Sequence, residues 1–335
     1  MSESHTNESR QTPQEPPVRP PRRRFRSLLI GVLLLSGLVL AVTHLGDIQR
    51  FGQLVQHAQP AWLLAGLCFQ IMTYVCAAAV WQQTLRRADV RYSVLSLVPL
   101  AFGKLFSDQA LPSSGMSGTG FIVAALRRRG IPSEICMAAF LVGLVTYYTA
   151  YLGVVLTSVA LLWFHHAIYG WIVAAVAVFC LVAVAIPTGA LWLQRRARGV
   201  LPGLFARIPG LGQLLQTYGK APVHLLRTPS LVAKVVLLQT AVFVLDAATL
   251  WAMLRAIGHE SSFLVAFPSF VVASIVATLG PVPLGIGTFE ASCVAMLGAL
   301  GVGVEAALTA TLLLRGFTLW LPMLPGMWIA KRELR

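Results

Sequence analysis

Apolar residues in this chain come in long runs that contain almost no charge. Six of these runs approach or exceed the roughly 20 apolar residues that one helical crossing of a bilayer needs. They cover residues 28–45, 61–81, 135–163, 168–193, 231–255 and 305–330. Two further apolar regions, 93–126 and 263–300, are each interrupted near the middle by Pro and Gly, and each predicts a hairpin of two short helices. The pattern therefore predicts an all-α polytopic membrane protein with six spans and two broken, re-entrant hairpins.

Composition supports the membrane class, because 57% of the residues are hydrophobic and only 11% are charged, whereas a soluble domain carries about 25% charged residues. Residues 1–27 are the exception, since they are polar and rich in Pro and Arg. We expect a disordered basic cytoplasmic tail there, and a transmembrane domain over 28–335. A cleaved signal peptide is the alternative, but no small-residue cleavage site follows Leu40.

The net charge of +14 at first suggests a nucleic-acid partner. The basic residues, however, stand in short groups between apolar runs, where they are typical of topology signals. Threading the chain from a cytoplasmic N-terminus puts all of them on the cytoplasmic side except Arg50, Arg255 and two within the membrane, Lys104 and Arg315. We expect a multi-pass inner-membrane protein with both termini in the cytoplasm, and no nucleic-acid partner.

An internal repeat relates the two interrupted regions. An offset of 171 residues places Pro112 on Pro283 and Gly130 on Gly301. Each unit then consists of a span, a broken hairpin and a span. The predicted units cover about 61–163 and 231–330, with a connecting span at 168–193 and a basic cytoplasmic loop at 194–230. Because a single crossing separates them, the two units have inverted topology, an arrangement that recurs in transporters.

The two hairpin tips are the candidate substrate site, because an unwound backbone leaves polar groups free at membrane depth. Glycine allows close backbone approach there, and hydroxyls can bond phosphate or sugar oxygens. The candidates in the first tip are Pro112, Ser113, Ser114, Gly115, Ser117, Gly118 and Thr119, and in the second Pro283, Gly285, Gly287, Thr288 and Glu290. The alternative is that each tip is only a helix breaker that lets two half-helices pack.

Ionisable residues at membrane depth each cost roughly 2.5–3.5 kcal/mol and need a partner or water. Lys104 and Asp108 are four residues apart and can pair with each other. Arg315 has no acid three or four residues away in its own helix, so we expect its partner to be Glu290 or Asp246. Such a pair either clamps the second hairpin or helps Arg315 to bind an anionic headgroup, which the planar guanidinium suits.

Metal, cofactor and catalytic signatures are missing from the sequence. The five cysteines, Cys68, Cys76, Cys136, Cys180 and Cys293, lie in apolar segments without C-x-x-C or metal-ligand spacing. No phosphate-cradling loop, Ser/His arrangement or paired carboxylates accompany them. We expect no metal, no cofactor and no enzymatic activity.

Two motifs resemble those of the lysylphosphatidylglycerol synthase transmembrane-region family. The first is Leu-Pro followed by Gly118-Thr119-Gly120-Phe121 and then the basic tract 126–132. The second runs from Gly280 to Glu290 and on to Gly301-Val302, with Arg315 and Pro325-Gly326 in the last span. The likeness extends from about 28 to 332.

The resemblance implies an integral inner-membrane domain that moves lipids between leaflets, with Glu290 and Arg315 at matching positions. Two departures accompany it. The sequence ends at Arg335 without an aminoacyl-transferring domain, so no synthase activity is expected. Relatives often carry an acid and an Arg where this chain has Ser117-Gly118-Thr119-Gly120, which removes the basis for a charge-dependent role at the first tip.

The leading hypothesis is thus a flippase-like protein whose partners are membrane lipids, either anionic phospholipids or lipid-linked substrates. The alternative is an accessory membrane subunit that docks a soluble lipid- or glycosyl-transferase through the basic loop 194–230. That loop could equally lie amphipathically on anionic lipid.

Overall fold

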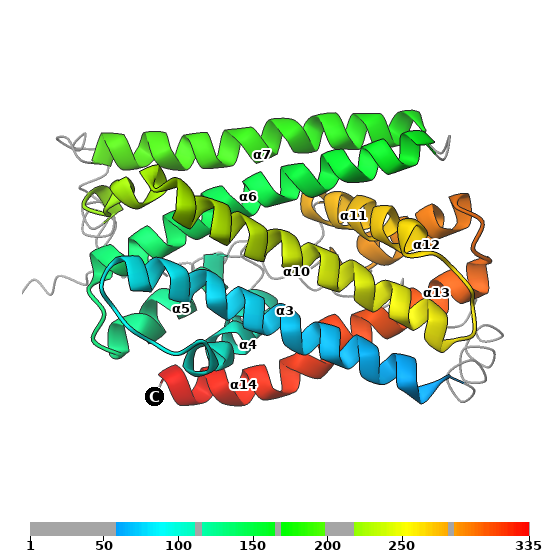
Figure 1. Cartoon of the computed structure of the whole chain (residues 1–335), viewed down its shortest axis with the longest axis horizontal. Coiled ribbons are helices and arrows are strands. Elements are labelled where there is room, and N and C mark those ends of the chain that lie inside the picture. The colour runs from blue at the N-terminus through cyan, green and yellow to red at the C-terminus, as the bar shows by residue number, and fades with distance from the viewer. Residues whose placement is uncertain (1–57, 111–115, 165–168, 198–217, 281–284, 335) are drawn as a thin grey trace, which may run out of the picture. The chain divides into compact units, whose positions relative to one another are not determined.

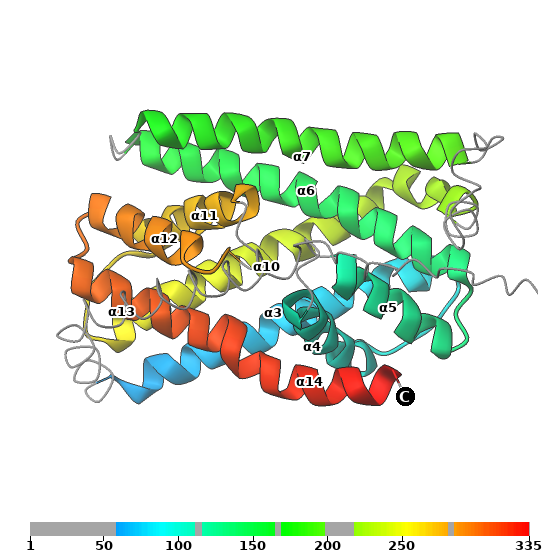
Figure 2. The same ribbon diagram turned by 180° about the vertical axis from the view of Figure 1, so that it is seen from behind.

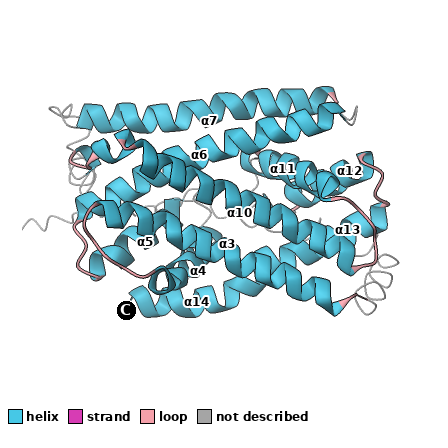
Figure 3. Ribbon diagram, viewed as in Figure 1, coloured by secondary structure: helices cyan, strands magenta, loops and turns pink. Residues whose placement is uncertain are grey.

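The computed structural model describes residues 58–110, 116–164, 169–197, 218–280 and 285–334. All of these residues belong to one compact unit, Phe51–Arg335, and their regular structure is helical, without a strand among them (Figure 3). The elements are α3 (Pro60–Arg87), α4 (Val94–Ala110), α5 (Met116–Arg128), α6 (Ser133–Phe164), α7 (Gly170–Ala197), η1 (Val223–Arg227), α10 (Pro229–Ala256), α11 (Phe263–Leu279), α12 (Thr288–Ala299), α13 (Val304–Arg315), η3 (Gly316–Trp320) and α14 (Leu321–Leu334).

Five of these helical stretches are long and apolar enough to cross a membrane: α3, α6, α7, α10 and the continuous segment Val304–Glu333 formed by α13, η3 and α14. Each coincides with one of the predicted spans, and the chain is a multi-pass membrane protein. The predicted span at 28–45 and the tail at 1–27 lie outside the described residues.

Helices α3 and α10 pack against each other in opposite directions (Figure 1). At one end the Gln59 N–H donates to the Ala256 carbonyl at 2.8 Å, and at the other the Arg87 guanidinium donates to the Ser230 hydroxyl at 3.0 Å. Gly66 lies at this interface, facing Met253 and Thr249 of α10. The antiparallel pair is therefore joined at both of its ends.

Each interrupted apolar region forms two short helices, as predicted. The α4–α5 pair has 17 and 13 residues, and the α11–α12 pair has 17 and 12. At 1.5 Å per residue none of them reaches the ~30 Å needed to cross the hydrocarbon core. The two hairpins lie toward opposite ends of the bundle (Figure 2).

Each hairpin packs against helices of both halves of the chain. Helix α4 packs against the distant α14, and α11 packs against the distant α6. Contact between α4 and α14 is tight at Gly326, where a Cβ would lie 2.6 Å from the Phe102 carbonyl oxygen. Each half therefore supplies a surface that completes the other.

Helix bounds in the two halves correspond under the 171-residue offset found in the sequence. Helices α3 and α10, α4 and α11, α5 and α12, and α6 and α13 begin at matching positions to within about two residues. The order is the same in both halves: a long helix, two short ones and a further span. Helix α7 stands between them.

Two predicted boundaries are wrong in detail. The first tip was expected to be unwound through Gly120, but α5 already begins at Met116, because small residues such as the buried Gly118 are tolerated in a packed membrane helix. The basic loop was expected to begin at residue 194, but α7 continues to Ala197, with Arg195 and Arg196 in the last turn, where cations favour the helix C-terminus.

Candidate functional site

An ion pair between α12 and α13 forms the centre of the candidate site. The Arg315 Nε donates to the Glu290 Oε1 at 2.5 Å, and the two side chains are only 13% and 19% exposed. Of the two partners that the sequence left open for Arg315, the structure selects Glu290. The pair joins the second hairpin to the last span.

The turn before α12 fixes the position of the Glu290 carboxylate. Gly287 caps the helix with a φ of 83°, a conformation that favours glycine. Its N–H donates to the Glu290 Oε2 at 2.6 Å. Glu290 thus lies in the first turn, where the helix dipole favours a negative charge, and each of its two oxygens has a donor. This carboxylate is therefore held in one place by donors on both oxygens.

Gly285 and Thr288 shape the same turn against α11. Gly285 has a φ of 61°, and a Cβ at this position would lie 2.6 Å from the Ala277 Cβ. The Thr288 hydroxyl donates to the Gly285 carbonyl at 3.1 Å. These two candidates therefore have a structural role in the hairpin, whatever ligand approaches it.

Arg315 is also positioned from its other side. Its guanidinium carbon lies 4.8 Å from the centroid of the Phe289 ring, a cation–π arrangement. The following turn, η3, is a π-helix, in which the Leu321 N–H bonds to the Gly316 carbonyl. Pro322 explains the wider turn, because it has no N–H and its ring clashes with the carbonyl four residues earlier. Such π-bulges are frequent at functional sites.

The first tip is not brought to this ion pair by the described contacts. Gly118 is buried in α5, and α5 packs against α4, α6 and α14, whereas α12 packs against α11 and α13. The side chains of Ser117 and Thr119 lie outside the described residues, as do Pro112, Ser113, Ser114, Gly115 and Pro283. Their predicted role in substrate binding stays a prediction.

The remaining charged candidates fall into different environments. Lys104 is partly buried in α4 and has an interaction partner, and the predicted pair with Asp108 lies outside the described side chains. Asp246, on α10, is not paired with Arg315. Its Oδ1 instead accepts from the Gln70 amide at 3.0 Å and from the Thr73 hydroxyl at 3.4 Å.

Asp246 belongs to a polar cluster, and the sequence pointed only to Asp246 and not to its partners. Gln70 also donates to the Thr249 hydroxyl at 2.9 Å, so the cluster links α3 and α10 through four side chains. Gln70 and Thr73 are three residues apart on α3, and a Gln within an apolar span was the available signal. Among the described residues no group of three or more metal-ligating side chains comes together.

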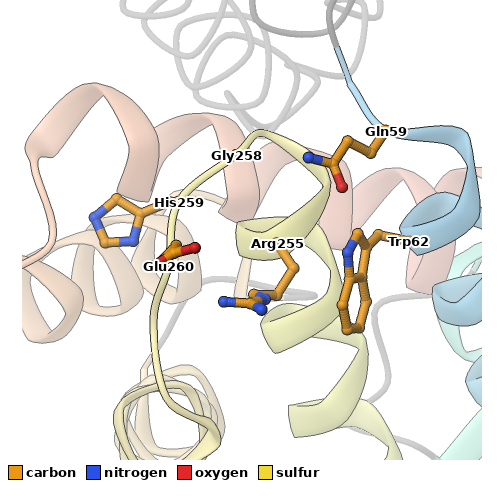
Figure 4. A pocket seen from close by; sticks show the side chains of 6 residues that line it. All are labelled: Gln59, Trp62, Arg255, Gly258, His259 and Glu260. Atoms are coloured by element: carbon orange, nitrogen blue, oxygen red, sulfur yellow. The ribbon is translucent and has the colours of Figure 1, made fainter.

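A cavity of about 220 Å³ lies where α3 begins and α10 ends, and none of the predicted site residues line it. Figure 4 shows its lining by Gln59, Trp62, Arg255, Gly258, His259 and Glu260. The Arg255 guanidinium carbon lies 5.4 Å from the Trp62 ring centroid. Trp and Arg side chains of this kind are typical of the membrane–water interface.

A family model described as the lysylphosphatidylglycerol synthase TM region matches residues 28–326. The chain therefore belongs to this membrane family, as its two motifs predicted. No curated protein gives a significant match.

Proposed function

We propose that this member of the family is a flippase-like inner-membrane protein that moves a lipid with an anionic polar headgroup between leaflets. The observation that carries the proposal is the partly buried Arg315–Glu290 pair at the junction of a half-length helix and a π-interrupted span. Family membership gives the membrane context, and the pair gives the chemistry.

Arg315 is deep enough to meet a headgroup in transit. It is eleven residues from the start of α13, or about 17 Å at 1.5 Å per residue, in a hydrocarbon core of roughly 30 Å. A charge at this depth has to be compensated, and Glu290 compensates it at rest. A lipid phosphate can replace Glu290 as the partner of the Arg315 guanidinium, because Arg donates to phosphate oxygens bidentately. Glu290 meanwhile keeps the Gly287 N–H as a donor.

The two halves of the chain support transport by alternating access. We infer that 61–163 and 231–330 are inverted-topology repeats, since their helices correspond in order and bounds and α3 and α10 run in opposite directions. The headgroup passes between the hairpins while the acyl tails stay in lipid. Rocking of one repeat against the other then exposes the site to either leaflet.

The distribution of charge supports a cytoplasmic position for both termini. Basic residues follow or close α3, α5, α7 and α14, and these four helix ends lie at one end of the bundle (Figure 1). The positive-inside rule assigns that end to the cytoplasm. We further propose that the protein has no catalytic cycle of its own and requires no cofactor.

The proposal is tested by measuring leaflet exchange of headgroup-labelled anionic phospholipid in proteoliposomes that contain the full chain. Arg315→Ala and Glu290→Ala are each expected to slow exchange by at least about tenfold, which corresponds to ~1.4 kcal/mol of lost stabilisation. Arg332→Ala, an exposed basic residue of the same span, is the matched control and is expected to retain the wild-type rate. Unchanged exchange in both site variants would overturn the mechanism.

The same assay separates lipid movement from the accessory-subunit hypothesis. A flippase moves lipid when it is the only protein in the membrane. An accessory subunit moves none alone and instead co-purifies with a soluble transferase in a manner that depends on residues 198–217. Purified protein with no exchange activity, together with such a transferase, would favour the second hypothesis.

A further inference from the structure

The acid on α10 differs from the one on α12 in the kind of partner it has. Asp246 accepts hydrogen bonds from an amide and a hydroxyl, both neutral, on α3. Among the described residues, no Lys, Arg or His forms an ion pair with it. A carboxylate without a cation at membrane depth requires a compensating positive charge when it is ionised.

The depth of Asp246 follows from its place in α10. It lies seventeen residues after the start of that helix and ten before its end, or about 26 Å and 15 Å along the axis. Gln70 is ten residues into α3, which begins beside the end of α10. The cluster is therefore well inside the membrane, on the interface between the first helices of the two halves.

Hydrogen bonding in the cluster selects a proton rather than a metal cation as the compensating charge. The Thr249 hydroxyl donates to the Leu245 carbonyl at 2.9 Å, so it must accept from Gln70. The Gln70 amide nitrogen, shared between Thr249 and Asp246, then points its hydrogens into the cluster. A metal ion there would face N–H groups instead of the oxygen ligands it needs.

The carboxylate has one oxygen left for a proton. Both hydrogen bonds reach Oδ1, and the described part of the chain offers no donor to Oδ2. Oδ1 can accept in either protonation state, whereas Oδ2 can carry the hydrogen of a neutral acid. The Gln70 amide can therefore keep its bond to Oδ1 when the proton binds.

Thr73 can change partners when the proton arrives. Its single hydroxyl hydrogen has two acceptors, the Phe69 carbonyl at 3.1 Å and the Asp246 Oδ1 at 3.4 Å. An ionised carboxylate attracts the donor more strongly than a neutral acid does. Protonation thus releases Thr73 to its own helix and removes one of the bonds between α3 and α10.

We infer that Asp246 is the proton-coupling residue that drives the lipid movement proposed above, on which this inference rests. A proton from water on one side forms the Oδ2–H bond. The same bond breaks after α3 and α10 have moved, and the proton leaves to water on the other side. One proton is carried, nothing is oxidised or reduced, and the lipid supplies no atom.

Few other titratable groups face this carboxylate. Tyr74 on α3 and Tyr147 on α6 lie close enough for its charge to act on them. Helix α11 has no titratable residue, and α13 has Glu305 and the Arg315 that pairs with Glu290. The remaining neighbour, η1, brings His224 and Arg227 to the far end of α10.

The test compares lipid exchange in proteoliposomes with and without a pH gradient across the membrane. The wild-type rate of lipid exchange is expected to differ at least about fivefold between the two conditions. Asp246→Asn, which keeps the Oδ1 acceptor, is expected to exchange lipid at the same rate in both. Glu260→Gln, an exposed acid after the same helix, should behave as the wild type. A gradient response retained by Asp246→Asn, or a response to Na⁺ instead, overturns the inference.

Thr73→Val is a second variant that keeps the acid and removes the hydroxyl switch. It is expected to remain gradient-dependent, with the midpoint of its pH–rate profile moved to higher pH, because the ionised carboxylate has lost a donor. An unmoved midpoint contradicts the switch.

Infrared spectroscopy of the purified full chain separates this inference from the lipid function. A protonated-carboxyl C=O band that titrates with pH in the wild type and is missing in Asp246→Asn supports the proton site even if no lipid moves, in which case only the lipid function fails. Lipid exchange without any such band overturns the proton site alone.

Discussion

Glu290 and Asp246 are both carboxylates at membrane depth, and the contrast between them lies in their neighbours. Glu290 has a guanidinium on one oxygen and a backbone N–H on the other, so one of its two donors is a cation. Asp246 has an amide and a hydroxyl on a single oxygen, so both of its donors are neutral. The comparison teaches that two acids at similar depth can have different donors, a cation in one case and neutral groups in the other, and this difference is the basis of the two roles proposed above.

Removing the cation from the first acid gives the largest expected effect. Arg315→Leu removes the cation that pairs with Glu290, whose side chain is 19% exposed. We expect the free energy of unfolding to fall by an amount on the order of 3 kcal/mol. The double variant Arg315→Leu/Glu290→Gln should recover most of this free energy of unfolding, because the unpaired carboxylate is no longer present. Lipid exchange should stay absent in the double variant. Denaturant unfolding in detergent measures the first result, and recovery of exchange in the double variant would show that the pair serves only as a clamp.

Removing the amide from the second acid gives a smaller effect. Gln70→Leu takes donors from both Asp246 and Thr249, and an unsatisfied buried acceptor costs about 1–3 kcal/mol. The same unfolding measurement applies, with Gln82→Leu on the same helix as the control, since its amide bonds a backbone carbonyl near the helix end. Equal effects of the two substitutions would contradict a special role for the cluster at Asp246.

The glycines of the second tip give the smallest effects and test how firmly Glu290 is held. Gly285→Ala places a Cβ 2.6 Å from the Ala277 Cβ in addition to an unfavourable φ, whereas Gly287→Ala meets open space. We expect about 1–2 kcal/mol of destabilisation for the first and ~1 kcal/mol for the second. Thermal unfolding of the two variants side by side checks this order, and a larger effect at Gly287 would show that the cap, more than the packing on α11, positions the carboxylate.

The sequence predicted those parts of the fold that depend on local composition. Five helices follow from runs such as 168–193, and both hairpins follow from Pro and Gly within apolar regions. The Arg315–Glu290 pair could be narrowed to two candidates because α13 contains no acid within reach of Arg315. The start of α5 at Met116 could not be predicted, since glycine is ambiguous between a breaker and a packing residue in a membrane helix.

The Asp246 cluster could not be predicted because its members come together only in the tertiary structure. Gln70 and Asp246 are 176 residues apart, and each is a single polar residue in an apolar helix. Which faces of α3 and α10 meet depends on close contacts such as that of Gly66 with Met253. A single sequence contains the cluster's residues but not their pairing.

The contact between α4 and α14 has a consequence for how the chain is made. Helix α4 is synthesised early, yet the surface that covers it, α14, emerges from the ribosome about 200 residues later, as the pairing of Arg129 with Glu333 across 204 positions illustrates. Until then the first hairpin is inserted in the membrane with one face uncovered. The contact between α4 and α14 can therefore form only after nearly the whole chain has been synthesised.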